Sequence, residues 1–232
     1  IEKIEHRIGQ LVERGTLLAG QGRAADFVTT REALGTEEAI LKAVDAGRGT
    51  ASPIVAADQA PGRLQGEAQR ELNTGQLAAA TLILASKDRT VNIQGIAGAG
   101  KSTMLASVAR VAEAEGRTIL GLAFQNKMVA DLAEGAGIKS QTIASFVLAN
   151  ERYLTERDTP RYEEARERLG GAMLVVDETS MVSQALLSRL VEALPPGCRL
   201  LLAGDPSQLE SIEAGSVLRD VVDAAKVDGA PL

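Results

Sequence analysis

Apolar positions recur at helical spacing over residues 1–50 of the chain. In "IEKIEHRIGQLVERG", residues 1–15, the aliphatic side chains fall on one helical stripe. A second helix is predicted up to Gly47, because Thr29 and Glu32 have capping-box spacing at its start. The N-terminal part of the chain is therefore predicted to be helical.

The next stretch, residues 47–66, is rich in Gly, Ala and Pro, which is typical of a linker. From Leu72 onward the pattern changes to alternating helices and strands. We therefore divide the chain into a helical N-terminal segment with its linker, residues 1–62, and a second unit, residues 63–232.

The strands predicted beyond Leu72 are short apolar runs without alternation of polar and apolar positions. Strands of that kind, separated by helices, indicate a parallel sheet that is buried on both faces. Ligands bind such sheets beyond the carboxyl ends of the strands, where this chain carries its polar motifs. The sequence therefore predicts an α/β fold with a central parallel sheet, whose strands are residues 90–94, 118–124, 172–177 and 199–205.

Composition narrows the possible functions. Hydrophobic residues make up 45% of the 232 residues, and the core must be aliphatic because aromatics are only 2% and Trp is absent. A net charge of −6 argues against a broad basic surface for duplex DNA, but a local groove for a single strand stays possible. Cys198, the single cysteine, begins an apolar run and is expected to be a buried thiol. With no secretory signal or long apolar span in view, we expect a cytoplasmic protein with no membrane partner.

The stretch "GIAGAGKST", residues 95–103, fits the phosphate-binding pattern G-x-x-x-x-G-K-[ST]. It follows a predicted strand and opens a predicted helix, so backbone N–H groups and a helix N-terminus would face the phosphates. Lys101 would reach the β and γ phosphates, Ser102 would bind Mg²⁺, and Thr103 would contact the α phosphate. An ordinary glycine-rich turn is the alternative. The predicted cofactor-binding residues of this loop are Gly98, Ala99, Gly100, Lys101, Ser102 and Thr103.

A pair of carboxylates, Asp177 and Glu178, follows the predicted strand "AMLVVD". An aspartate at this position can hold Mg²⁺ through water, and the adjacent glutamate can polarise the attacking water as a general base. Alone, such a pair is more often a solvated strand end. After a phosphate loop it favours ATP hydrolysis over phosphoryl transfer to a small molecule, and it makes Asp177 and Ser102 the predicted metal ligands.

Two glutamines complete the predicted site. In "GDPSQ", Gln208 follows the last strand, where a side-chain amide can contact both the γ-phosphate and the attacking water. Gln76, upstream of the loop, carries the donor and the acceptor that pair with the N6 and N7 edge of adenine. The alternatives are a plain turn for Gln208 and a solvent-facing helix start for Gln76. The predicted catalytic residues are therefore Lys101, Asp177, Glu178 and Gln208.

The order of these motifs resembles that of superfamily-one helicases of the RecD-like branch. Within that branch, the strings "QTIASF", "DETSMV" and "GDPSQLESIEAG" resemble the helicase portion of conjugative relaxase–helicases of the TraI type, MobF class. The resemblance covers residues 25–222. It implies a RecA-like P-loop domain from a 5′-to-3′ ATP-dependent DNA helicase of plasmid transfer, with ATP and Mg²⁺ as its cofactors.

The resemblance also implies contacts to single-stranded DNA, since "FQNKMVADL" and "QTIASF" match two DNA-contacting motifs. The sequence departs from many relatives, which have Pro-Thr in place of Phe124-Gln125 and a His in place of Ser145. Two aromatics, Phe124 and Phe146, are candidates either for base stacking or for core packing. The candidate contacts to the DNA backbone are Gln125, Asn126, Thr142 and Ser145.

A helicase of this type has two RecA-like domains with ATP between them, and the second supplies arginine fingers. The chain starts without Met and ends soon after "ESIEAGSVLRDVV", so we expect a fragment. Its partners would then be the second RecA-like domain and the relaxase domain of the parent protein, and the conjugative secretion machinery. We expect it to bind nucleotide weakly, to unwind nothing and to hydrolyse ATP poorly. A robust DNA-stimulated ATPase rate would refute this hypothesis.

Other interpretations stay open. A RecD-like repair helicase carries the same motifs, and a relaxase domain upstream in the gene would decide between the two. A non-catalytic nucleotide-binding, DNA-binding or secretion-recognition module is a second alternative, with residues 1–60 as its recognition surface. A small-molecule kinase is a third, but it leaves "GDPSQLESI" unexplained. The charged stretch 150–168 alternates in sign, which favours a solvated helical face over a DNA path along its arginines.

Overall fold

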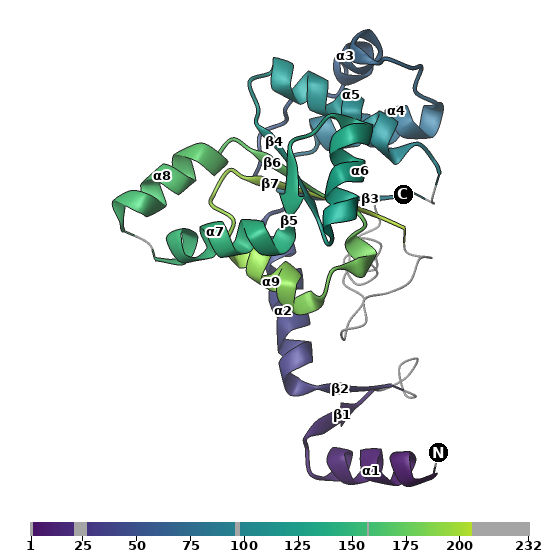
Figure 1. Cartoon of the computed structure of the whole chain (residues 1–232), viewed down its shortest axis with the longest axis vertical. Helices are drawn as coiled ribbons and strands as arrows, with labels where there is room; N and C mark the ends of the chain where they lie inside the picture. The colour runs from purple at the N-terminus through teal and green to yellow at the C-terminus, as the bar shows by residue number, and fades with distance from the viewer. Residues whose placement is uncertain (1, 21–26, 96–97, 157, 206–232) are drawn as a thin grey trace.

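A five-stranded parallel sheet lies at the centre of the molecule, in the order β3-β7-β6-β4-β5 (Figure 1). The structure is a computed structural model and describes residues 2–20, 27–95, 98–156 and 158–205. Every residue of β6 and β7 is buried, as expected for strands covered on both faces. The predicted α/β class is confirmed, and its strands are β3 (Thr90–Gln94), β4 (Ile119–Ala123), β5 (Ser140–Thr142), β6 (Met173–Val176) and β7 (Arg199–Gly204).

Two hydrophobic clusters cover the two faces of the sheet, and alternate strand residues supply them. Met173 and Val175 of β6 belong to the first cluster, whereas Leu174 and Val176 belong to the second. The first cluster contains residues of α3 (Ala60–Glu67), α4 (Thr74–Ala85), α5 (Lys101–Ala114) and α6 (Asn126–Ala136). The second contains residues of α2 (Arg31–Ala46), α7 (Ile143–Thr155), α8 (Pro160–Leu169) and α9 (Gln184–Glu192).

The predicted linker is wrong, because part of it is packed and helical. Ile54 and Val55 are 8% and 5% exposed and belong to the first cluster. Helix α3 follows, with Pro61 in its first turn, where the missing N–H of proline costs nothing. The composition suggested a linker because glycines and Pro61 make up much of this short helix and few apolar residues mark its buried face. Leu64 on that face is fully buried.

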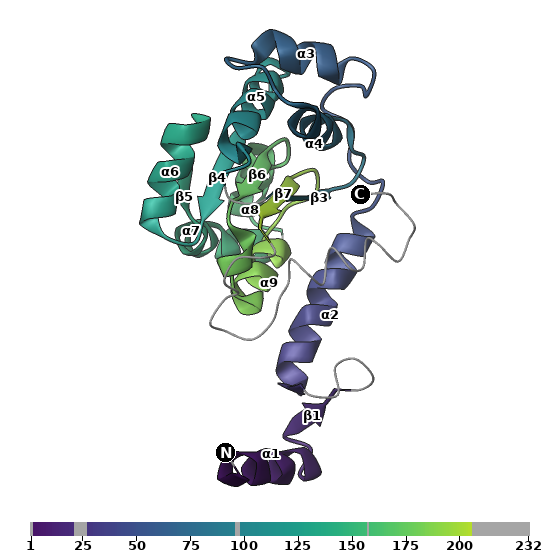
Figure 2. The same ribbon diagram turned by 90° about the vertical axis from the view of Figure 1, so that its right-hand side faces the viewer.

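The N-terminal region is not purely helical, which corrects the prediction for residues 1–50. Helix α1 (Glu2–Glu13) leads into an antiparallel hairpin of β1 (Leu17–Ala19) and β2 (Val28–Thr30), and α2 follows. Figures 1 and 2 show α1 and the hairpin at the end of α2 that is farther from the sheet. The N-cap of α2 is Thr30, whose Oγ1 accepts from the N–H of Ala33, and not Thr29 as predicted.

The charged stretch of residues 150–168 lies in α7 and α8, which join in a helical arm at one side of the sheet (Figure 1). The short strand β5, just before α7, was not predicted. Three arginines of the arm have partners within the arm: Arg152 with Glu156, Arg166 with Glu163, and Arg168 with Asn150. Alternating charges that pair along an exposed helix surface, as in the first two of these contacts, are typical of a solvated helical face.

Candidate nucleotide-binding site

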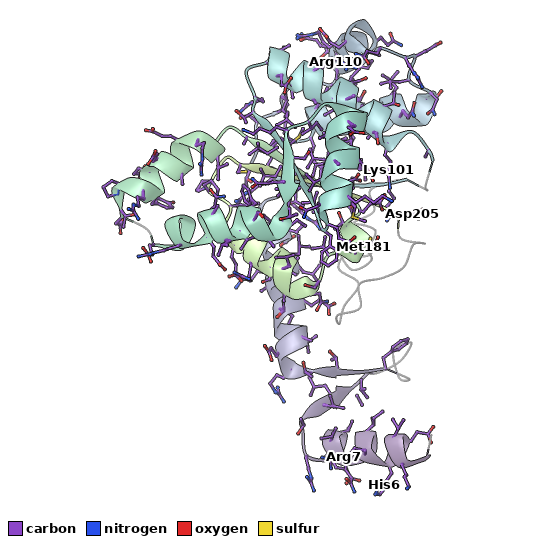
Figure 3. The ribbon with its side chains drawn as sticks, in the orientation of Figure 1. His6, Arg7, Lys101, Arg110, Met181 and Asp205 are labelled. Atoms are coloured by element: carbon purple, nitrogen blue, oxygen red, sulfur yellow. The ribbon has the colours of Figure 1, made fainter. Side chains whose placement is uncertain are left out.

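Three strands bring the predicted catalytic groups to one edge of the sheet. The register pairs Gln94 of β3 with Gly204 of β7, and Val176 of β6 with Leu202 of β7, so the three strands end close together. The phosphate loop follows β3, Asp177 follows β6, and Asp205 follows β7. Figure 3 shows the labelled side chains of Lys101 and Asp205 at this edge. Gln208, the fourth predicted catalytic residue, lies outside the described residues.

Two glycines bend the phosphate loop through backbone conformations that other residues rarely adopt. Gly98 and Gly100 have φ of 78° and 80°. Gly100 is the N-cap of α5, so the helix begins at Lys101 and its first N–H groups open toward the loop. Because Gly95 donates to the carbonyl oxygen of Gly204 at 3.1 Å, the loop is anchored to the neighbouring strand. This is the local geometry that an anion-binding strand–loop–helix requires.

Lys101 and Glu178 form an ion pair across the site. The Lys101 Nζ lies 3.1 Å from Glu178 Oε1, and the two side chains are only 13% and 21% exposed. Partial burial strengthens such a pair relative to one in bulk water. Glu178, the predicted general base, thus neutralises Lys101, the residue predicted to bind the phosphates.

Glu178 is held in an unusual backbone conformation. Its φ and ψ are 50° and 48°, a left-handed combination that costs a residue with a side chain on the order of 1–2 kcal/mol. Glu178 Oε2 and Ser180 Oγ are also buried without a hydrogen-bond partner among the described residues. Thr179 fixes this turn, since its Oγ1 donates to the carbonyl oxygens of Val176 and Ala203. Strain and unpaired polar atoms concentrate at functional sites, and here both fall on the acidic strand end.

Burial raises the pKa of the Asp177 carboxyl, and the negative charge of Glu178 raises it further. The backbone N–H of Glu178, which donates to Asp177 Oδ1 at 3.0 Å, and the charge of Lys101 offset part of this rise. A carboxyl group that is hard to ionise without a partner can bind a cation, because the positive charge of the cation stabilises the carboxylate and lowers its pKa.

The Gln76 side chain is bonded at both ends to the protein. Its Oε1 accepts from the backbone N–H of Asn73 at 3.0 Å, as the second half of a capping box at the start of α4. Its Nε2 donates to the carbonyl oxygen of Ala99 at 3.0 Å, and more weakly to that of Gly100 at 3.4 Å. A Cβ at Gly100 would collide with Gln76 Nε2. Gln76 therefore contacts the phosphate loop directly, and adenine reading would need this amide to change partners.

A cavity of about 250 Å³ lies beside the loop, between the start of α4 and the end of β3. Apolar side chains from three elements, together with Asn73 and Gln76, line it. A pocket with an apolar floor and a few polar groups is typical of small-molecule sites. The apolar lining residues are Ala79, Ile93, Ala99 and Met104.

Sequence reasoning missed Asn73. Its Oδ1 accepts from the N–H of Gln76 at 2.9 Å, so it fixes the start of α4 beside the loop. The signal was present in "NTGQ", because Asn followed three residues later by Gln is the spacing of a capping box.

The residues present fit a nucleotide with Mg²⁺. The bent loop offers N–H groups, the cavity offers an apolar wall, and the unpaired atoms at Glu178 and Ser180 offer polar partners. Ser102 and Asp177 would offer hard oxygen ligands, the kind that Mg²⁺ prefers when substrate phosphates complete its shell.

The candidate DNA contacts lie at the same carboxyl edge, on the other side of β6. Ala123 of β4 pairs with Thr142 of β5, so Gln125 follows one strand close to the end of the other. Thr142 is the N-cap of α7: its Oγ1 accepts from the N–H of Ser145 at 3.1 Å and donates to Ser145 Oγ at 2.8 Å. Gln125 caps α6 without a side-chain hydrogen bond, and it is exposed, as is Asn126.

The two candidate stacking aromatics differ in exposure. Phe146 is 1% exposed and belongs to the second hydrophobic cluster, so it is a core residue. Phe124 is 40% exposed at the end of β4. The Cys198 thiol is fully buried, as predicted, and burial raises its pKa to about 12.

The strand order, the glycine-bent loop and the acidic strand end together define a P-loop nucleotide-binding domain. Residues 71–232 match the AAA domain family, and the chain belongs to that family.

Two conjugation proteins and a subunit of the RecBCD enzyme are similar in sequence. The multifunctional conjugation protein TraI of Escherichia coli K12 is 28% identical over 220 residues, which are 91% of this chain and 12% of TraI. The probable conjugal transfer protein TraA of Sinorhizobium fredii is 36% identical over 60% of this chain and 12% of its own length. The RecBCD enzyme subunit RecD of Mycobacterium tuberculosis is 40% identical over 58% of this chain and 26% of its own length. These relatives confirm the resemblance to RecD-like helicase domains of conjugation proteins.

The chain spans about an eighth of the length of TraI and TraA and about a quarter of RecD. The solved structures that align with part of this chain include the Pif1 helicase from Candida albicans, at 19% identity over 62% of this chain and 34% of that protein, with a TM-score of 0.43. Bacteroides Pif1 bound to ssDNA is 24% identical over 67% of this chain and 37% of its own, with a TM-score of 0.43. Among the described residues, no helix is long and apolar enough to cross a bilayer.

Proposed function

We propose that the chain is the ATP-binding first RecA-like domain of a 5′-to-3′ DNA helicase, in a relaxase–helicase that acts in conjugative plasmid transfer. One observation carries the proposal: Lys101 of the phosphate loop meets Glu178 of the acidic strand end at 3.1 Å, beside the half-buried Asp177. This contact joins two motifs that lie 77 residues apart in the sequence. The similarity to TraI and TraA supplies the conjugative setting.

In this proposal, Lys101 binds the β and γ phosphates in exchange for Glu178. The exchange replaces one anion by another, so the cation stays neutralised. Glu178, once released from Lys101, accepts a proton from the attacking water. The oxygen of that water bonds to the γ-phosphorus as the bond from this phosphorus to the β–γ bridging oxygen breaks, and ADP is the leaving group. Ser102 and Asp177 would hold Mg²⁺, which supplies charge neutralisation at the phosphates when bound. Gln208 would contact the γ-phosphate and the water, as the resemblance implies.

Single-stranded DNA would cross the carboxyl ends of β4 and β5. The proximity of Gln125 and Thr142 at this edge supports that path, because both side chains carry uncharged hydrogen-bonding groups. Such groups suit backbone contacts that break and re-form at each step. Phe124, with 40% of its surface exposed, is available beside them for base stacking.

A RecD-like repair helicase is the second candidate, since RecD has 40% identity to this chain. The extent of the similarity favours the conjugative setting, because the match to TraI covers 91% of the chain and the match to RecD covers 58%. The TraI match therefore reaches into the N-terminal region, ahead of the motor motifs.

Two binding measurements test the proposal on the 232-residue chain. A fluorescent ATP analogue should bind in the presence of Mg²⁺, and unlabelled ATP should displace it. A fluorescein-labelled oligothymidine should bind with an affinity that changes when ATP is added, because both ligands occupy one edge of the sheet. A chain that binds neither ligand would contradict the proposal, and a chain that binds ATP alone would contradict its DNA half.

A further inference from the structure

Gly135, near the end of α6, lies against Ser102, which the proposed function assigns as a magnesium ligand. A Cβ built at Gly135 would come 3.1 Å from Ser102 Cβ and 3.3 Å from Ser102 Oγ. Both distances are shorter than ordinary van der Waals contact, so a side chain at this position would push on Ser102. Ser102 stands in the first turn of α5, directly after the loop lysine.

The glycine is not explained by the needs of the helix. Glycine is the poorest helix former apart from proline, and α6 already has Gly137 as its left-handed C-cap. Core packing does not call for glycine either, because Gly135 is exposed, while its neighbours Leu132 and Ala136 make the buried contacts. Ser102 supplies the only atoms that a Cβ at Gly135 would meet within 4 Å among the described residues.

Another mid-helix glycine provides the contrast. Gly35 lies in the interior of α2, and a Cβ there would meet nothing within 4 Å among the described residues. An alanine at Gly35 therefore changes only helix propensity, whereas an alanine at Gly135 also presses on the Ser102 side chain. Comparing alanine at the two positions therefore separates the effect of helix propensity from the effect of the contact with Ser102.

We infer that Gly135 is a positioning residue for the magnesium site: by lacking a side chain, it leaves the Ser102 hydroxyl free to take its place as a ligand. Mg²⁺ demands near-ideal octahedral geometry at about 2.0–2.1 Å, so a ligand displaced by a few tenths of an ångström binds it poorly. The phosphate cradle depends on backbone N–H groups and tolerates that displacement better. A side chain at position 135 should therefore weaken the binding of Mg²⁺ more than the binding of the nucleotide.

The experiment measures binding of a fluorescent ADP analogue to the chain, with Mg²⁺ and with EDTA. Gly135→Ala should lower the Mg²⁺-dependent gain in affinity about ten-fold, the scale of effects seen when groups supporting a metal ligand are changed. Binding in EDTA should stay within about two-fold of the wild type, which also shows that the variant is folded. Gly35→Ala should match the wild type under both conditions.

A double-mutant cycle distinguishes positioning of Ser102 from general damage. Ser102→Ala should abolish the Mg²⁺-dependent gain, and adding Gly135→Ala to it should change nothing further. Three outcomes would overturn the inference: wild-type behaviour of Gly135→Ala, an equal loss in EDTA, or a further loss on the Ser102→Ala background. The inference rests on the proposed function, and a wild-type chain with no Mg²⁺-dependent nucleotide binding would overturn both, whereas failure of Gly135→Ala alone leaves the proposed function intact.

Discussion

The two halves of the carboxyl edge keep their functional side chains in different states. At β3, β6 and β7, the groups assigned to the nucleotide are bonded to one another: Lys101 to Glu178, and Gln76 to the loop carbonyls. At β4 and β5, Thr142 and Ser145 serve as the cap of α7, while Gln125 is exposed and makes no cap bond.

The difference shows where binding must rearrange the protein. In the proposed function, a nucleotide entering its half would displace the ion pair and the amide, so part of its binding energy would be used to break existing contacts. A DNA strand entering the other half meets side chains that are exposed or fixed by a helix end, so it needs less rearrangement. Substitutions should therefore affect the two halves in different ways.

Glu178→Gln should have the largest effect. Loss of the general base should lower DNA-stimulated ATP hydrolysis by the full-length protein about 10²–10⁴-fold. The same change removes the negative charge that pairs with Lys101, so ATP should bind about five-fold more tightly, which corresponds to about 1 kcal/mol. Steady-state hydrolysis and equilibrium titration measure the two effects, and Glu38→Gln on the exposed side of α2 is the control. Weaker ATP binding by Glu178→Gln would show that the ion pair does not compete with nucleotide.

Gln125→Ala should lower affinity for oligothymidine about five-fold, as expected for one lost hydrogen bond of about 1 kcal/mol. The stability of the chain should not change, since Gln125 makes no cap bond. Gln59→Ala is a matched control, because Gln59 is also a helix N-cap without a side-chain hydrogen bond. Equal DNA binding by the two variants in an anisotropy titration would argue against a strand path at β4.

Thr142→Ala should lower the stability of the chain, whereas Gln125→Ala should leave it unchanged. Loss of the N-cap of α7 should lower the free energy of unfolding by about 1 kcal/mol, measured by urea denaturation. Thr142→Ser keeps the capping oxygen and should retain most of that stability. An unchanged unfolding midpoint for Thr142→Ala would show that the cap contributes nothing.

Asp177→Asn should raise the stability of the folded chain slightly, whereas Thr142→Ala should lower it. Because the folded pKa of Asp177 is raised, ionisation of this carboxyl costs stability at every pH above its unfolded pKa of about 3.9. The amide avoids this cost and still accepts the Glu178 N–H, so the variant should be more stable than wild type at pH 7. The advantage should vanish as the pH falls below about 4. Thermal unfolding across pH measures it, and a less stable variant at pH 7 would contradict the raised pKa.

The elements that sequence alone predicted best are the long or fully apolar ones. The predicted strand 172–177 lies within one residue of each end of β6, because its fully buried apolar residues stand out between two glycines and an acidic pair. Strands β1, β2 and β5 were missed, since three residues are too few to show a period. Helix α3 was missed because its glycines and proline resemble a linker.

The candidate site was predicted by residue type but not by partner. The motifs named Lys101 and Glu178, yet their ion pair joins residues 77 positions apart and depends on strand order. The bond from Gln76 to the loop and the contact between Gly135 and Ser102 likewise arise from packing between helices and the loop. Such contacts are tertiary, so no local pattern records them.

Titration of ATP in the presence of Mg²⁺ into the wild-type chain and Lys101→Ala tests the central claim most directly. The account predicts saturable binding by the wild type and a loss of about 30-fold in Lys101→Ala, the scale of a hydrogen bond to a charged group at about 2 kcal/mol. Lys42→Ala, on the exposed surface of α2, should bind as the wild type does. Equal affinities for wild type and Lys101→Ala would contradict the assignment of this loop as an ATP site.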